Sequence, residues 1–202
     1  EIHERLVGSE MCIRDRDKDK RLQFYFYPDT LYGNNPASAY YEKKLPGDPP
    51  YSTQLRQYTW SLMKYRDLSK PAKRALSYKP FIAYRLADTY ILGAEAHWRK
   101  GNTEKALEYL NAIRLRAGLE EATTIDLQAI MDEYARELCF EGKRWFFLKR
   151  IGKLVEQVNK YHRFGSTTSS IQGTTMKDYM VRWPIPQAQI DAMGTFPQNP
   201  QY

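Results

Sequence analysis

Two glutamates, Glu137 and Glu141, have the spacing in this 202-residue chain that most directly suggests catalysis. They lie four residues apart, so a helix would place both carboxylates on one face, and a pair of carboxylates is what a glycosidase uses. Arg136 and Arg144 lie close to them in the sequence, and arginine partners turn such carboxylates into ion pairs. We therefore predict that these four residues form a structural network that fixes two helices on either side of Gly142.

The histidines, serines and cysteines lack the neighbouring residues that a metal site or a catalytic nucleophile needs. His97 and His162 have neither a second ligand four residues away nor a neighbouring Cys or His, so the sequence predicts no metal site. No serine or cysteine lies in a nucleophile-elbow pattern, and no glycine-rich phosphate loop follows a strand. Cys12 and Cys139 are too few for a disulfide framework. We expect no cofactor and no catalytic residue.

A third group of candidates lies in and beside a loop rich in proline, asparagine and glycine at 33–50. Tyrosines in such a loop are buried less often than tyrosines on a helical stripe, which makes ligand contact plausible. Asn34 can hydrogen-bond hydroxyl groups, although an asparagine close to a proline is first of all a turn former. The candidate ligand-binding residues are Tyr32, Asn34, Tyr40 and Tyr41, with packing within the turns as the alternative.

The net charge of +7 suggests nucleic-acid binding at first sight. The basic residues, however, are interspersed with acidic ones along the expected helices, and no Lys/Arg run of five or more occurs. This pattern indicates a solvated surface. No apolar stretch approaches the roughly 18 residues of a membrane span.

The elements that must position these residues are expected to be helical hairpins. Residues 84–117 have the 34-residue length of a tetratricopeptide helix pair, with Gly101 and Asn102 at the turn. Residues 126–158 are expected to form a second helix pair with its turn at Gly142. One helix pair must stack on the other to be stable. The aromatic residues predicted to be core are Tyr84, Tyr90, Trp98, Tyr134 and Trp145. The fold class is mainly α, with tetratricopeptide-like stacked hairpins, irregular Tyr/Pro-rich loops and short strands.

Three regions are expected along the chain. Residues 1–16 are expected to be an artefact or a disordered tail, because LVGSEMCIRDR resembles a translated sequencing-adaptor sequence. Residues 17–79 predict an irregular region with short strands at 22–27 and 57–67. Residues 80–202 predict the helical region, which ends in an extended segment at the two prolines that flank Ile185.

Four segments carry a resemblance to a known family: YRLADTYILGAEA, ALEYLNAIRLRAGL, ARELCFEGKRWFFLKRIGKL and RWPIPQAQIDAMGTFPQNPQY. In this order they resemble the C-terminal half of the SusD/RagB nutrient-binding outer-membrane lipoproteins. The last segment is the most specific, and residues 19–22 match an Asp-x-Arg-Leu element that is usual in the family. The chain departs from the family pattern at Tyr134, Phe147 and Gln201, where Arg, Asp and Gly are common.

The resemblance implies a non-enzymatic protein on the surface of a Bacteroidetes-type outer membrane, held there by a lipid anchor in the family's N-terminal half. It implies capture of a glycan or other nutrient and delivery to a SusC-like TonB-dependent transporter. Aromatic rings would stack on the apolar faces of sugars, and amides and carboxylates would hydrogen-bond their hydroxyls. The alternatives are an intracellular tetratricopeptide adaptor that binds peptides and a glycoside hydrolase that uses Glu137 and Glu141.

Overall fold

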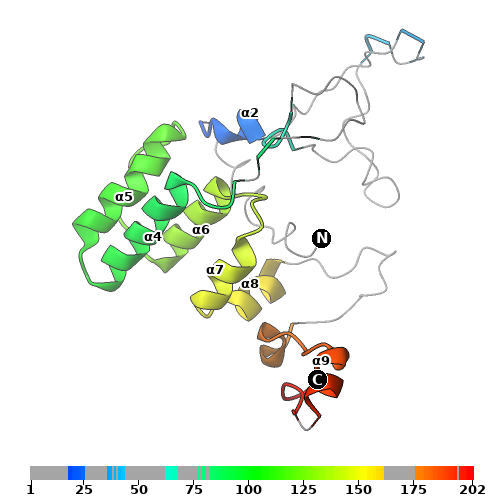
Figure 1. Cartoon of the computed structure of the whole chain (residues 1–202). Coiled ribbons are helices and arrows are strands. Elements are labelled where there is room, and N and C mark those ends of the chain that lie inside the picture. Colours follow the sequence, from blue (N-terminus) through cyan, green and yellow to red (C-terminus); the bar gives the residue numbers. More distant parts are fainter. Residues whose placement is uncertain are drawn as a thin grey trace. The chain divides into compact units, whose positions relative to one another are not determined.

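The computed structural model describes residues 18–25, 36–37, 39, 41–43, 62–67, 77, 79–80, 82–161, 176–194 and 196–202, without the side chains of Leu22 and Tyr161. The chain divides into two compact units. Gly8–Cys139 holds helices α2, α4, α5 and α6, and Phe140–Tyr202 holds α7, α8, the 3-10 helix η1 and α9 (Figure 1). The predicted mainly α fold is confirmed, since the described residues contain no strand beyond the single bridge residues Tyr41 and Leu62.

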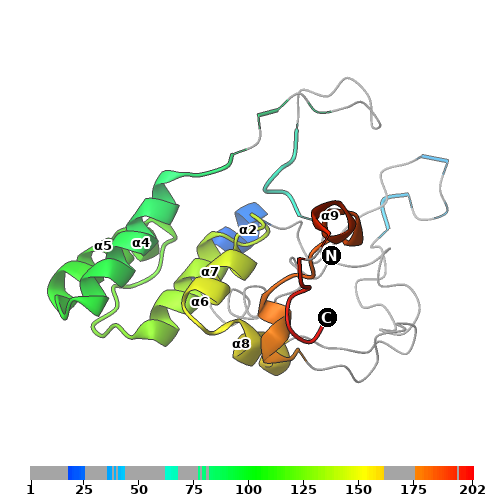
Figure 2. The ribbon, with the colours of Figure 1, turned by 60° about the horizontal axis from the view of Figure 1, so that its bottom comes forward.

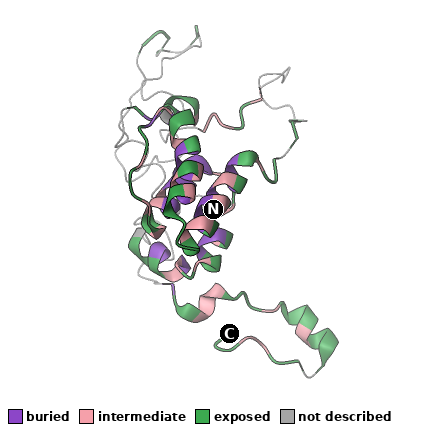
Figure 3. Ribbon diagram, turned by 90° about the vertical axis from the view of Figure 1, so that its left-hand side faces the viewer, coloured by how far each residue is buried: buried purple, intermediate pink, exposed green. Residues whose placement is uncertain are grey.

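Three helices form the body of the Gly8–Cys139 unit: α4 (Leu86–Arg99), α5 (Thr103–Arg116) and α6 (Leu127–Glu137). They lie side by side in Figures 1 and 2, and their facing sides carry the buried residues coloured in Figure 3. Ile91, Leu110 and Ile130, one from each helix, are almost fully buried. Apolar residues three and four apart on each helix meet here, so the core follows from the helical period of the sequence.

The turn between α4 and α5 has the predicted chemistry. Gly101 adopts a left-handed φ of +75°, and the Asn102 side chain accepts a hydrogen bond from the backbone N–H of Lys105 at 3.2 Å. Within α4, Gly93 lets the ring of Tyr109 come close, because a Cβ at that position would lie 2.9 Å from ring atoms. The predicted helix pair of residues 84–117 is therefore confirmed, with α4 beginning at Leu86.

The aromatic residues predicted to be core differ in their burial. Tyr134 is buried, whereas Tyr90, Trp98 and Trp145 are only partly buried. Tyr84 is 83% exposed, so its assignment to the core was wrong. The reason is local: the N-cap residue Arg85 has extended dihedrals, and Tyr84 therefore precedes the helix and does not share its apolar face.

The first strand prediction was wrong as well. Arg21–Tyr25 forms helix α2, although the aromatic run at 22–27 favours a strand. The Asp19 carboxylate accepts a hydrogen bond from the Arg21 N–H at 3.1 Å, and the Lys20 N–H donates to the Ala117 carbonyl at 3.0 Å. These contacts fix the start of the helix, and tertiary context overrides β propensity. Of the second predicted strand, the described residues 62–67 contain one bridge residue and a turn.

The Phe140–Tyr202 unit begins with two short helices, α7 (Arg144–Arg150) and α8 (Leu154–Tyr161). The sequence predicted one helix here. Gly152 instead adopts a φ of +71°, its N–H donates to the Lys149 carbonyl, and the Lys153 N–H donates to the Leu148 carbonyl. These bonds are typical of a helix end with a left-handed glycine, so the chain turns between two helices. Leu148 and Leu154, on either side of the turn, are buried.

The last segment contains η1 (Asp178–Val181) and α9 (Gln187–Met193), joined by the predicted extended stretch at Trp183–Pro186. The Gln198 side chain accepts from the Ile185 N–H at 2.8 Å and donates to the Ile185 carbonyl at 2.9 Å. Asn199 donates to the Trp183 carbonyl at 2.7 Å. The last five residues, Gln-Asn-Pro-x-Tyr at 198–202, are called the terminal motif, and this motif holds the extended stretch through side-chain amides. None of the helices that the structure describes is both long and apolar enough to cross a membrane.

Candidate functional site

A buried cluster of ion pairs surrounds two glutamates of α6, Glu133 and Glu137, in the Gly8–Cys139 unit. The Arg21 guanidinium donates to Glu133 Oε1 at 2.6 Å and to Glu137 Oε2 at 3.2 Å. Asp19 holds the same guanidinium through two bonds, from Nε to Oδ1 at 2.8 Å and from Nη2 to Oδ2 at 2.7 Å. Helix α2 is thereby fixed to α6 by one arginine and three carboxylates.

Further arginines complete the cluster. Arg85 Nη1 donates to Glu137 Oε1 at 2.6 Å and its Nη2 donates to the Glu137 carbonyl oxygen at 2.6 Å, while Arg116 also forms an ion pair with Glu137. Arg136 Nη2 donates to Glu133 Oε2 at 2.7 Å. The cluster thus joins α6 to the start of α4 and the end of α5.

The sequence pointed to Arg136 as a partner of Glu137, and this pairing was wrong. Arg136 forms an ion pair with Glu133. Glu137 forms ion pairs with Arg21, Arg85 and Arg116. Adjacent residues point about 100° apart on a helix, whereas residues three apart share a face, so Arg136 meets Glu133. Arg136 and Glu137 nevertheless both belong to a structural network.

Glu141 and Arg144, the other two residues of the predicted network, lie in the Phe140–Tyr202 unit. The Glu141 carboxylate is buried and lies 3.6 Å from the amino group of Lys143. The Arg144 guanidinium lies over the ring of Phe147, 5.7 Å from its centroid. Both residues therefore have a contact within their own unit.

Burial and charge act against each other in the cluster. Burial opposes the charge of Glu133, but the attraction of Arg21 and Arg136 outweighs it and lowers the pKa of Glu133 below its ordinary value. Burial likewise opposes the charge of Arg21, while Asp19 and Glu133 raise the pKa of Arg21 above its ordinary value. Burial, followed by the charge of Glu137, raises the pKa of Tyr25 to about 12. Glu133 and Glu137 are both paired with arginines and 0% exposed, so a sugar has no access to them.

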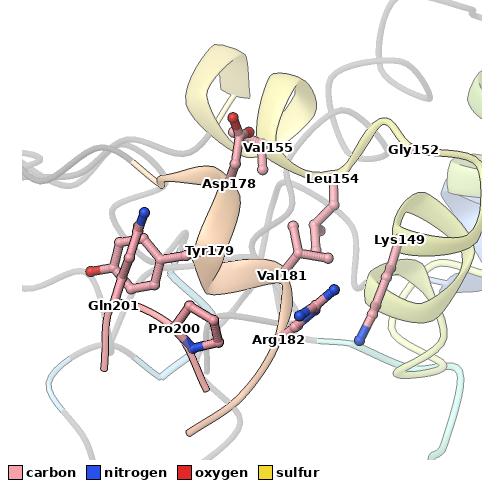
Figure 4. A pocket seen from close by; sticks show the side chains of 10 residues that line it. All are labelled: Lys149, Gly152, Leu154, Val155, Asp178, Tyr179, Val181, Arg182, Pro200 and Gln201. Carbon is pink, nitrogen blue, oxygen red and sulfur yellow. The ribbon is translucent and has the colours of Figure 1, made fainter. Parts of the chain in front are cut away.

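A pocket of about 550 Å³ lies within the Phe140–Tyr202 unit. Figure 4 shows the side chains around it, which come from the end of α7, the start of α8, η1 and the C-terminal segment. Its lining residues are Lys149, Gly152, Leu154, Val155, Asp178, Tyr179, Val181, Arg182, Pro200 and Gln201. Ligand pockets have volumes of roughly 300–1,000 Å³ and combine apolar walls with a few polar groups, and this pocket has both properties. We refer to it as the C-terminal pocket.

The candidate ligand-binding residues from the sequence are placed only in part. Tyr41 is 41% exposed, while Tyr32, Asn34 and Tyr40 lie outside the described residues. His97 stacks on the ring of Tyr109 at 5.5 Å, as a structural histidine would. Among the described residues, no group of three or more His, Cys, Asp or Glu side chains is arranged to hold a metal ion.

Two features of these sites were not predicted from the sequence. Arg21 was part of the Asp-x-Arg-Leu element, but nothing in the sequence indicated that α6 provides its partners. The lining residues Lys149 and Arg182 of the C-terminal pocket were not predicted either. The feature of the sequence that could have indicated the pocket is the terminal Gln-Asn-Pro-x-Tyr motif, because its Tyr202 hydroxyl donates to the Arg182 carbonyl.

Comparison with known proteins gives consistent matches. The starch-binding protein SusD of Bacteroides thetaiotaomicron is 33% identical over 140 residues, which are 68% of this chain and 24% of that protein. A SusD superfamily protein from Parabacteroides distasonis shares the fold, with a TM-score of 0.69 and 23% identity over 96% of this chain and 41% of that chain. Surface glycan-binding protein A from Bacteroides thetaiotaomicron, in complex with laminarihexaose, has a TM-score of 0.63 and 25% identity over 96% of this chain and 40% of that chain.

The chain spans about a quarter of the length of the curated relatives that it matches. The model of the SusD family matches residues 8–202, which is nearly the whole sequence and includes the buried cluster, the C-terminal pocket and the terminal motif. The chain therefore belongs to the SusD family.

Proposed function

We propose that this protein captures a glycan at the outer-membrane surface, without chemical turnover, and delivers it to a SusC-like TonB-dependent transporter. The observation that carries the proposal is the family match over residues 8–202. One relative is named for starch binding and one similar structure holds laminarihexaose, which supports a saccharide as the ligand.

The chemistry of the chain suits this role. The pyranose ring of a sugar has an apolar face that an aromatic ring can cover and hydroxyl groups that amides can bind. We propose that Tyr41, which is exposed, contributes such a ring together with Tyr32 and Tyr40, and that Asn34 hydrogen-bonds hydroxyls. The buried cluster fixes α2, α4 and α5 to α6, and we assign its glutamates no role in bond cleavage.

The ligand-binding part of the proposal is tested with protein produced from its complete reading frame. Starch and laminarin are embedded in native gels, and retention of the protein is compared with retention in a gel without polysaccharide. Replacing Tyr41 with alanine should weaken binding about two- to twelvefold, as expected from the loss of roughly 0.5–1.5 kcal/mol of aromatic contact. Tyr84→Ala, which removes an exposed tyrosine outside the loop, is the matched control and should bind as the wild type does.

The delivery and location parts need a different experiment. We propose that a lipid anchor holds the protein on the cell surface beside its transporter. Mild detergent extraction and affinity purification of the tagged protein should recover a TonB-dependent transporter, and protease added to intact cells should digest the protein. Recovery from the cytosol with no transporter would instead favour the peptide-binding adaptor.

A further inference from the structure

The C-terminal pocket has a distribution of charge that points to a particular class of saccharide. We propose that it binds the anionic substituent of an acidic saccharide, with Lys149 and Arg182 contacting the carboxylate or sulfate and Asp178 accepting a hydrogen bond from a hydroxyl. The choice of a saccharide rests on the proposed function, while the choice of an anion rests on the pocket itself. No assignment of this pocket follows from the family match.

The two cations are available to a ligand. Among the described residues, no hydrogen bond or ion pair joins the side chain of Lys149 or Arg182 to another group. Other basic residues of the same unit are paired, since Lys153 contacts Glu156 at 2.6 Å and Lys143 contacts Glu141 at 3.6 Å. Two cations that have no partner in the described part of the unit and line one pocket favour an anion, and a guanidinium can bind a carboxylate or sulfate through two parallel bonds.

The backbone that carries Arg182 is held in place. Its N–H donates to the Tyr179 carbonyl at 3.1 Å, and its carbonyl accepts from the Tyr202 hydroxyl at 2.9 Å. The Tyr202 ring also meets the ring of Tyr179 edge-on, with centroids 5.1 Å apart. A binding group on an ordered backbone loses less entropy when a ligand arrives, which favours affinity.

The remaining walls suit the rest of a sugar. Leu154, Val155 and Val181 form an apolar wall, and the Tyr179 ring lines another side of the pocket. In Figure 4, Lys149 and Arg182 lie at one end, and the carboxylate of Asp178 lies toward the other. A sugar that places its acidic group between the two cations therefore directs other ring positions toward Asp178, whose carboxylate accepts hydrogen bonds from hydroxyls.

The test uses calorimetric titration of the protein from its complete reading frame with three probes: trigalacturonate, a sulfated carrageenan oligosaccharide and neutral laminarihexaose. At least one acidic probe should bind, and its affinity should fall as sodium chloride is raised. The double variant Lys149→Ala/Arg182→Ala should lose at least about tenfold in affinity for that probe. The carboxylated and sulfated probes distinguish the two anion sources.

The matched control is Lys20→Ala/Lys100→Ala, which removes the same charge from exposed positions in the other unit and should bind the acidic probe as the wild type does. Equal thermal midpoints would show that both double variants are folded. Undiminished binding of the acidic probe by Lys149→Ala/Arg182→Ala, or an equal loss in the control, would overturn the pocket proposal while leaving glycan capture intact. Failure of every polysaccharide and oligosaccharide to bind the wild type would remove the proposed function as well.

Discussion

Basic residues of the buried cluster and of the C-terminal pocket have opposite surroundings. In Gly8–Cys139, Arg21 and Arg136 are 4% and 3% exposed and contact the fully buried Glu133. In Phe140–Tyr202, Lys149 and Arg182 line a pocket and have no side-chain partner among the described residues. Burial and partners, not residue type, therefore separate charges that hold helices together from charges that are available to a ligand.

The comparison also explains why the buried carboxylates do not form an active site. A catalytic acid or base must be accessible and must change its protonation state at the working pH. Glu133 is enclosed, and Arg21 and Arg136 keep its pKa low. A buried charge destabilises the fold when one of its partners is removed. Substitution of any member of the cluster should therefore lower the unfolding free energy.

The largest expected effect is the loss of Arg21. Arg21→Ala leaves Asp19, Glu133 and Glu137 buried without the guanidinium that they share, and breaking a buried pair costs about 3–5 kcal/mol. Chemical denaturation should show a loss of unfolding free energy of this size. Lys18→Ala removes an exposed cation from a surface pair with Glu120 and should leave the denaturation midpoint unchanged. Similar results for both variants would remove the distinction between buried and exposed charges.

Acidification should give the next largest effect. The folded-state pKa of Glu133 is lowered from 4.5, so its contribution to stability is present above pH 4.5 and is lost as the pH falls through the folded-state value. The unfolding midpoint should therefore decrease steadily below pH 4.5. Glu133→Gln removes this titrating group, and its midpoint should change less over the same pH range. An identical slope in both proteins would assign the acid sensitivity to other groups.

A smaller effect is expected at the start of α6, the helix that carries both glutamates. The Asp126 side chain accepts a hydrogen bond from the Ala129 N–H at 2.7 Å. Asp126→Ala should cost about 1 kcal/mol of unfolding free energy, because it removes an N-cap. Asp126→Asn keeps a capping oxygen and should stay close to the wild type. An equal loss in both variants would attribute the effect to charge and not to capping.

The smallest effect on stability is expected at the C-terminal pocket. Lys149→Ala/Arg182→Ala removes two exposed side chains that hold no partner in the described structure, so the unfolding free energy should change by no more than about 0.5 kcal/mol. Chemical denaturation beside Arg21→Ala would make the comparison direct. A loss of several kcal/mol would show that these cations hold the unit together.

The helices of the fold could be predicted because their signals are local. Apolar residues three and four apart, together with Gly101 and Asn102, determine α4, α5 and the turn between them. Helix α2 could not be predicted, since the partner Glu133 of Arg21 lies 112 residues away and outweighs the β propensity of its neighbours. The end of α7 before Gly152 was not predicted, because apolar residues at helical spacing continue past this glycine in the sequence.

The candidate sites show the same limit. The structural character of Glu137 followed from nearby arginines in the sequence, but its partners Arg21, Arg85 and Arg116 come from other helices and segments. The C-terminal pocket combines Lys149 from α7 with Arg182 beyond η1, and only the fold brings them to one cavity. Tyr41 is exposed, as its loop composition suggested, and its contact with a ligand stays a prediction.

The most direct test is one calorimetric titration series of the protein, produced from its complete reading frame, with maltoheptaose, laminarihexaose and trigalacturonate. Binding without turnover predicts a saturable heat signal for at least one of them and no continuing heat after saturation. A flat signal for all three, or steady heat accompanied by released sugar, would contradict the account.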